Sequence, residues 1–224
     1  MGLDMYLNKM PRYKEATASD VSKVEHYLDW LKAKINGSKY GNCTFEEWCG
    51  CNSTPSQEYL EFYANHYHVY YSDWDKEQKH PYTSIMTEVG YWRKANQIHN
   101  WFVENIQDGE DDCCYHREVT KDDLEELMDV CHEVLCSCEL VDGEICNGYK
   151  YDNGKRIPIM EEGKYVADPS VAEMLLPSTS GFFFGSTAYD EYYVEDLRNT
   201  IDIVTKILET TDFDKEMIYY ISSW

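Results

Sequence analysis

The sequence lacks any long apolar run, because no stretch approaches the roughly 18 residues that a membrane-spanning helix requires. Basic residues are also scarce, with 20 Lys and Arg against 42 Asp and Glu and a formal charge of −22 at pH 7. Nucleic-acid phosphates and anionic lipids attract positive surfaces, so we expect no direct binding to nucleic acid or membrane. The opening MGLDMYLNKM has no charged segment followed by an apolar one. This predicts a protein without a secretory signal, located in the cytoplasm of a host cell.

Catalytic fingerprints are missing as well. The chain contains no P-loop, no G-x-S-x-G, no HExxH and no Rossmann glycine pattern. Its nine cysteines are an odd number and need no pairing in a reducing compartment. Three groups contain most of them: Cys43, Cys49 and Cys51; Cys136, Cys138 and Cys146; Cys113 and Cys114 with His116. None has the paired C-x2-C spacing of structural zinc sites, so we predict no metal and no cofactor, with zinc as the alternative.

The periodicity of apolar residues predicts an α+β fold. Gly2–Leu7 alternates Leu3, Met5 and Leu7 with polar or aromatic residues, which is typical of a half-buried strand. Helical spacing recurs in four further segments near 21–35, 57–67, 121–138 and 191–208, with cap signals at Ser19 or Asp20, at Thr54, and at Thr120 with Asp123. The chain ends in the strand-like MIYYISSW. Turn dipeptides between residues 140 and 166 indicate a hairpin. We therefore predict one domain, 1–224, with four to five helices packed on a few short strands and a hairpin insertion at 140–166.

The stretch Ile85–Ile106 carries the sharpest prediction. Eight apolar residues fall on one face at 100° per residue, which predicts a single long amphipathic helix. Glu88, Asn96 and His99 project into that apolar face. A buried polar group costs roughly 1–3 kcal/mol unless it is hydrogen-bonded, so we expect these three side chains to have a functional or structural role.

One interpretation of these polar residues is a ligand pocket. Arg93 on the flank of the helix would bind a phosphate or carboxylate, and His99 would act as an acid, base or hydrogen-bond donor. The remaining wall would come from a second segment; the full candidate set is Glu88, Arg93, Asn96, His99, Ser186, Tyr189 and Asp190. The alternative interpretation is a core network in which Asn96 and His99 satisfy loop backbone while the residues near 190 cap a helix.

Four segments also resemble a family of small, uncharacterised proteins of bacteriophages and bacteria. They are MGLDMYL (Met1–Leu7), EVGYWRKANQIHNWF (Glu88–Phe102), LPSTSGFFFGSTAYDEYY (Leu176–Tyr193) and YYISSW (Tyr219–Trp224). The resemblance covers both ends and the middle of the chain, but not the cysteine-rich loop or the segment 140–166. It implies an accessory role in a mobile element and interference with a host system. It identifies no catalytic residue.

An acidic segment suggests where a partner would bind. Residues 104–129 hold eleven acids against Arg117 and Lys121. The solvated face of a helix is the ordinary explanation, and a surface for a Lys- or Arg-lined groove is the functional one. The candidate residues are Glu110, Asp111, Asp112, Asp122, Asp123 and Glu126.

Two functions follow from these observations. The first is a non-catalytic phage-type protein that inhibits a host defence protein or nucleoprotein of basic character through an acidic, Tyr-rich surface. The chain has 20 tyrosines, a residue enriched at interfaces. The second is a protein or small enzyme that binds or sequesters an anionic metabolite such as a nucleotide at the predicted pocket. A contiguous negative face with His99 sealed in the core favours the first function, and an opening lined by Arg93, His99 and Tyr189 favours the second.

Overall fold

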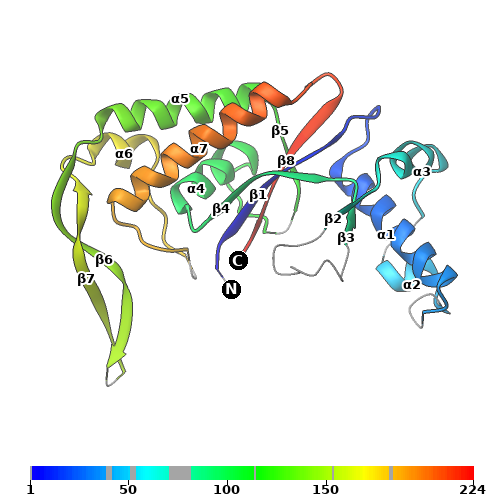
Figure 1. Cartoon of the computed structure of the whole chain (residues 1–224), viewed down its shortest axis with the longest axis horizontal. Helices are drawn as coiled ribbons and strands as arrows, with labels where there is room; N and C mark the ends of the chain where they lie inside the picture. The colour runs from blue at the N-terminus through cyan, green and yellow to red at the C-terminus, as the bar shows by residue number, and fades with distance from the viewer. Residues whose placement is uncertain are drawn as a thin grey trace. The chain divides into compact units, whose positions relative to one another are not determined.

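The computed structural model describes residues 2–38, 42–50, 54–70, 82–113, 115–152, 154–181 and 184–224. It confirms the α+β class (Figure 1). The described strands are β1 (Asp4–Pro11), β2 (His68–Tyr70), β3 (Tyr82–Ser84), β4 (Thr87–Arg93), β5 (Arg117–Val119), β6 (Leu140–Asp152), β7 (Lys155–Val166) and β8 (Glu216–Ser223). The helices are α1 (Ala18–Ile35), α2 (Phe45–Cys49), α3 (Gln57–Tyr63), α4 (Asn96–Ile106), α5 (Lys121–Ser137), α6 (Ser170–Leu175) and α7 (Glu191–Thr210), with a 3-10 turn, η2 (Ala64–His66).

The chain forms two compact units. The first comprises Met1–Asn8, Glu88–Thr211 and Ile218–Trp224, and the second comprises Lys9–Thr87 and Asp212–Met217. Strands β1 and β8 each contribute residues to both units. The helices beyond the expected four to five are short, since α2, α3 and α6 span only five to seven residues each. No helix among the described residues is long and apolar enough to cross a membrane.

Four strands form a sheet in the order β4-β1-β8-β5. The alternation predicted for β1 is confirmed, because Leu3, Met5 and Leu7 are fully buried while the residues between them are half-buried. The Lys94 amide donates to the Leu3 carbonyl at 2.8 Å. A Cβ atom added at Gly90 would lie 2.7 Å from the Ile203 side chain of α7, so this glycine lets the helix pack closely against the sheet.

The prediction of a single long helix over Ile85–Ile106 is wrong. The segment is a strand, β4, followed by a turn and then by α4, which begins only at Asn96. The turn residue Lys94 has a φ of 64°, a left-handed conformation that ends the strand sharply. In β4 the buried residues are Gly90 and Trp92, which gives the period of two of a strand. This period was not recognised in the sequence, because glycine carries no apolar side chain to mark the buried face. The proposed common face of Glu88, Asn96 and His99 therefore does not exist.

Helices α4, α5 and α7 build the core of the first unit, with α5 and α7 lying side by side (Figure 1). The predicted cap of α5 is confirmed, because the Thr120 hydroxyl and the Asp123 carboxylate form a reciprocal capping box. The buried apolar residues recur at helical spacing and comprise Leu124, Leu127, Cys131 and Val134 on α5 and Val194, Leu197, Val204 and Ile207 on α7.

The hairpin predicted at 140–166 is present as the antiparallel pair β6 and β7. It runs from Leu140 opposite Val166 to Asp152 opposite Lys155, with a bulge between Cys146 and Tyr149. Its root joins the first unit through the Val166 amide, which donates to the Tyr189 carbonyl at 2.9 Å. Figure 1 shows its distal end lying away from the helices of that unit.

The second unit contains α1, α2, α3 and the two-stranded sheet β2-β3, and it is rich in aromatic contacts. Helix α1 is capped by Thr17 and not by Ser19 or Asp20, and Asp20 completes the capping box. Helix α3 is capped by Ser56, two residues after the expected Thr54. Buried Tyr63 of α3 donates its hydroxyl hydrogen to the Pro11 carbonyl at 3.1 Å, which fastens α3 to the segment before α1.

Candidate functional site

The seven predicted ligand residues do not line one pocket. Glu88 and Arg93 lie on β4 and are exposed, and Arg93 approaches Asp4 on the neighbouring strand at 3.9 Å. Asn96 and His99 are instead buried in the first turn of α4. The other three belong to the segment before α7. The change from helix to strand at residues 87–93 is the reason for this separation.

Asn96 fastens a loop to the start of α4. Its side-chain nitrogen donates to the carbonyls of Phe184 and Ser186 at 3.2 and 2.8 Å, and its side-chain oxygen accepts from the Thr179 amide at 2.8 Å. The side chain is 1% exposed. Both amide hydrogens and the amide oxygen are therefore occupied by loop backbone, which is the arrangement of a core network.

His99 lies between a surface carboxylate and a buried phenol. Its Nε2 is 3.1 Å from Asp111 Oδ2, and its Nδ1 is 2.7 Å from the Tyr220 hydroxyl. A carboxylate only accepts, so Nε2 carries the hydrogen in the neutral ring and Nδ1 accepts from Tyr220. Burial lowers the pKa of His99, and Asp111 partly opposes this change. At neutral pH the ring is a neutral connector between α4, β8 and the loop after α4.

The geometry leaves His99 no access to a substrate. Its residue exposure is 2%, and the edge of Phe184 packs against the ring at a centroid distance of 5.3 Å. Its partner Tyr220 is stacked on Phe102 at 3.9 Å, and burial holds the pKa of the Tyr220 phenol well above its ordinary value. A general base must reach the proton that it removes, and both ring nitrogens here are occupied within the core.

The three predicted residues before α7 accept hydrogen bonds from backbone amides. Asp190 caps α7, with Oδ1 accepting from the amides of Tyr192 and Tyr193 at 3.0 and 3.2 Å. The Tyr189 hydroxyl accepts from the Ser178 amide, and the Ser186 hydroxyl accepts from the Ala188 amide. Burial raises the pKa of Asp190. These contacts hold the loop between α6 and α7 in place, as the core-network interpretation predicts.

A buried acid that the sequence analysis did not single out lies beside this network. Asp196 of α7 accepts from the Gln97 side chain of α4 at 3.0 Å, and burial raises its pKa to about 6. Gln97 is 2% exposed. The incorrect helix over 85–106 placed Gln97 on the solvent side, so no pattern in the sequence indicated this pair.

The six predicted partner-binding acids divide into two groups. Three are used within the molecule: Asp111 contacts His99, Asp112 accepts from Gln107 and Arg117, and Asp123 completes the cap of α5. The other three, Glu110, Asp122 and Glu126, are exposed. Asp111 and Asp112 therefore tie the loop after α4 to the body of the first unit.

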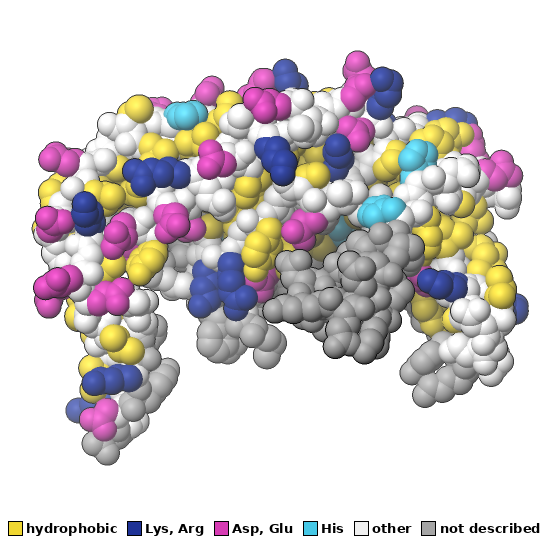
Figure 2. All heavy atoms as spheres, viewed as in Figure 1, with side chains coloured by type: hydrophobic (Ala, Val, Ile, Leu, Met, Phe, Trp, Pro, Cys, Tyr) yellow, Lys and Arg dark blue, Asp and Glu magenta, His cyan; other side chains and the backbone are white. Residues whose placement is uncertain are grey.

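An exposed acidic stripe runs along α5. It consists of Asp122, Glu126, Asp129 and Glu133, all exposed, at successive spacings of four, three and four residues. This spacing places the four carboxylates on one face over roughly 16 Å. None of them forms an ion pair with a residue that the structure describes, whereas the neighbouring Glu125 pairs with Lys121 at 3.0 Å. On the face drawn in Figure 2, acidic and basic side chains are interspersed, so the charge is not uniformly negative there.

Among the described residues, no group of three or more His, Cys, Asp or Glu side chains is placed to hold a metal ion. Cys51 and Cys114, which belong to two of the predicted cysteine groups, lie outside the described residues. No family model, curated protein or solved structure matches the chain.

Proposed function

We propose that the protein is a non-catalytic binding protein that inhibits a basic host protein or nucleoprotein, in the mobile-element role that the sequence resemblance implies. The acidic stripe of α5 is the contact surface, and the host cytoplasm is the compartment. The single observation that carries the proposal is the set of four aligned, exposed carboxylates without a basic partner among the described residues.

The carboxylates of the stripe repel one another, and no ion pair with a described residue offsets this repulsion. Like charges three or four residues apart destabilise a helix by roughly 0.2–0.5 kcal/mol per pair. Asp122 and Glu126, Glu126 and Asp129, and Asp129 and Glu133 are three such pairs. A groove lined with Lys and Arg would neutralise them, and the potential of the stripe would speed encounter with such a groove.

Exposed aromatic residues support a binding role. Tyr115, Tyr165 and Tyr192 of the first unit are 69%, 44% and 45% exposed. Tyrosine offers a large contact area with a polar tip and is enriched at protein interfaces. By contrast, Asn96 and His99, the buried polar residues of the predicted pocket, are engaged in the core. The contacts therefore favour the interaction protein over the metabolite-binding alternative.

Capture from a bacterial lysate tests the proposal. The wild type is compared with a variant neutralised on the stripe, Asp122→Asn, Glu126→Gln, Asp129→Asn and Glu133→Gln. A matched control neutralises the exposed acids of α7, Glu195→Gln, Asp202→Asn and Glu209→Gln. We expect the wild type and the α7 control to retain a basic protein at low salt and to release it as salt rises, and the stripe variant to retain little. Equal capture by all three proteins, or capture of no basic protein, would refute the proposal.

A further inference from the structure

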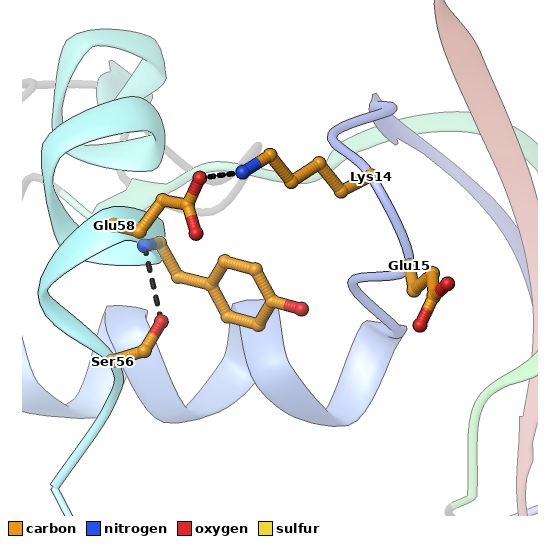
Figure 3. A pocket seen from close by; sticks show the side chains of 5 residues that line it. Lys14, Glu15, Ser56 and Glu58 are labelled. Carbon is orange, nitrogen blue, oxygen red and sulfur yellow. Dashed lines mark hydrogen bonds and ion pairs between the residues drawn. The ribbon is translucent and has the colours of Figure 1, made fainter.

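A hollow in the second unit has the composition of a site for a cationic side chain. It is open to solvent, has a volume of about 530 Å³ and is lined by Lys14, Glu15, Ser56, Glu58 and Tyr59. This volume lies within the range of small-ligand sites. The lining comes from two places, the segment before α1 and the first turns of α3, and Figure 3 shows Lys14 and Glu58 reaching toward each other from them.

Aromatic packing fixes the ring of Tyr13, which lies beside the hollow and contacts two of its lining residues, Glu58 and Tyr59. Tyr13 stacks on Phe62 at a centroid distance of 4.2 Å and an interplanar angle of 15°, and its edge meets Tyr59 at 6.3 Å and 82°. Phe62 in turn packs edge-on against buried Tyr63 at 5.0 Å. The ring of Tyr13 is therefore held on two sides before any ligand arrives, which reduces the ordering cost of binding.

The protein already places a cation in this hollow. The Lys14 ammonium contacts Glu58 Oε1 and lies 5.3 Å from the centroid of the Tyr13 ring. The Tyr13 hydroxyl donates to the same carboxylate oxygen at 2.8 Å. A carboxylate beside the ring of a tyrosine is a combination that proteins use to bind ammonium and guanidinium groups. Lys14 thus shows which chemistry the hollow accepts.

Lys14 is poorly held as an occupant. Its side chain is 58% exposed and that of Glu58 is 49% exposed, and ion pairs in such surroundings contribute little to stability. A ligand that binds Glu58 better can therefore displace it.

We infer that Glu58, Tyr13 and Tyr59 form a receptor for an arginine side chain of a basic partner protein, and that Lys14 occupies the receptor until that partner binds. A guanidinium group presents a planar fork that engages both carboxylate oxygens and stacks on an aromatic ring, which a lysine ammonium does not. Glu58 Oε2 accepts no hydrogen bond from a described residue and is available for the second arm of the fork. The inference rests on the proposed function, because it supplies a second contact for the same class of partner.

NMR titration of the full chain with N-acetyl-arginine amide tests the receptor. We expect saturable amide shifts centred on Tyr13, Lys14, Glu58 and Tyr59. N-acetyl-citrulline amide, which has a similar shape without the charge, should produce no saturable shift. Shifts that do not saturate or that spread over all acidic surfaces, or equal binding of the citrulline compound, would overturn the inference.

Three variants sharpen the titration. Glu58→Gln should weaken binding about tenfold, because it removes the charge-assisted contact. Lys14→Ala should tighten binding about twofold, since it removes the competing ammonium. Glu46→Gln, an exposed acid on α2 of the same unit, should leave binding unchanged. Weaker binding by Lys14→Ala, or unaltered binding by a folded Glu58→Gln protein, would contradict the assignment.

The two proposals fail separately. The stripe variant of α5 should titrate with the arginine compound as the wild type does. Loss of partner capture by that variant together with a flat titration would overturn only the arginine receptor. A saturable titration together with unaltered capture by the stripe variant would overturn only the role of α5.

Discussion

Two acidic regions follow each other in the first unit, and the structure uses them differently. In the loop between α4 and β5, Asp111 and Asp112 accept hydrogen bonds from His99, Gln107 and Arg117. On α5, the acids of the stripe point to solvent without a described ionic partner. The loop acids stabilise the fold, whereas the helix acids oppose one another. Similar local composition therefore has two physical meanings, and only contacts distinguish them.

The largest expected effect is the loss of a loop acid. Asp112→Ala should lower the free energy of unfolding by about 2–3 kcal/mol, because charge-assisted bonds to Gln107 and Arg117 are lost and Gln107 remains buried. Urea denaturation measures the change. The neighbouring exposed acid supplies the control, since Glu110→Gln should alter stability by less than about 0.5 kcal/mol. Equal effects of the two substitutions would abolish the distinction between the regions.

Asp196 of α7 adds a third kind of acidic residue to the comparison, because its carboxyl group is largely buried. The folded state raises the pKa of Asp196 from 3.8 to about 6, so its protonated form is favoured by folding. Its stabilising contribution is complete below about pH 4 and is lost as the pH rises through about 6. Asp196→Asn should therefore stabilise the protein at pH 7 by up to about 3 kcal/mol, with Gln97 still hydrogen-bonded.

Denaturation of wild type and Asp196→Asn at several pH values between 4 and 8 isolates this contribution. The difference in stability between the two proteins should grow between about pH 4 and pH 6 and level off above that. A difference that is independent of pH would show that Asp196 titrates normally in the folded protein.

The smallest effect concerns the stripe itself. Asp129→Lys converts two repulsive pairs, with Glu126 and with Glu133, into two attractive pairs. It should stabilise the protein by about 0.5–1 kcal/mol at low salt while weakening partner binding. Thermal unfolding at low and high salt measures the first effect, which salt should diminish. A destabilised variant would mean that Asp129 has a structural role like that of Asp112.

The sequence predicted those elements whose pattern is purely local. The start of α5 follows from Thr120 and Asp123. The hairpin at 140–166 is present, although two of the dipeptides that predicted it, Asp142-Gly143 and Asn147-Gly148, lie within β6. The strand β4 was missed because Val89 and Trp92 fit a helical stripe while Gly90 marks the inner face without a side chain. His99 and Tyr220 are 121 residues apart, and no local pattern can show that they share a hydrogen bond. The contact between Asp111 and His99 could not be predicted for the same reason, because the chain changes direction between these two residues.

The partner's affinity for the stripe variant tests the central claim most directly. Titration calorimetry would compare the wild type, the four-residue stripe variant and Asp112→Asn against the captured basic protein, at two salt concentrations and at a temperature where all three are folded. We predict a loss of at least about tenfold for the stripe variant with a smaller dependence on salt, and near wild-type binding for Asp112→Asn. Unchanged binding by the stripe variant, with a loss in Asp112→Asn, would assign the interface to the loop and contradict the account.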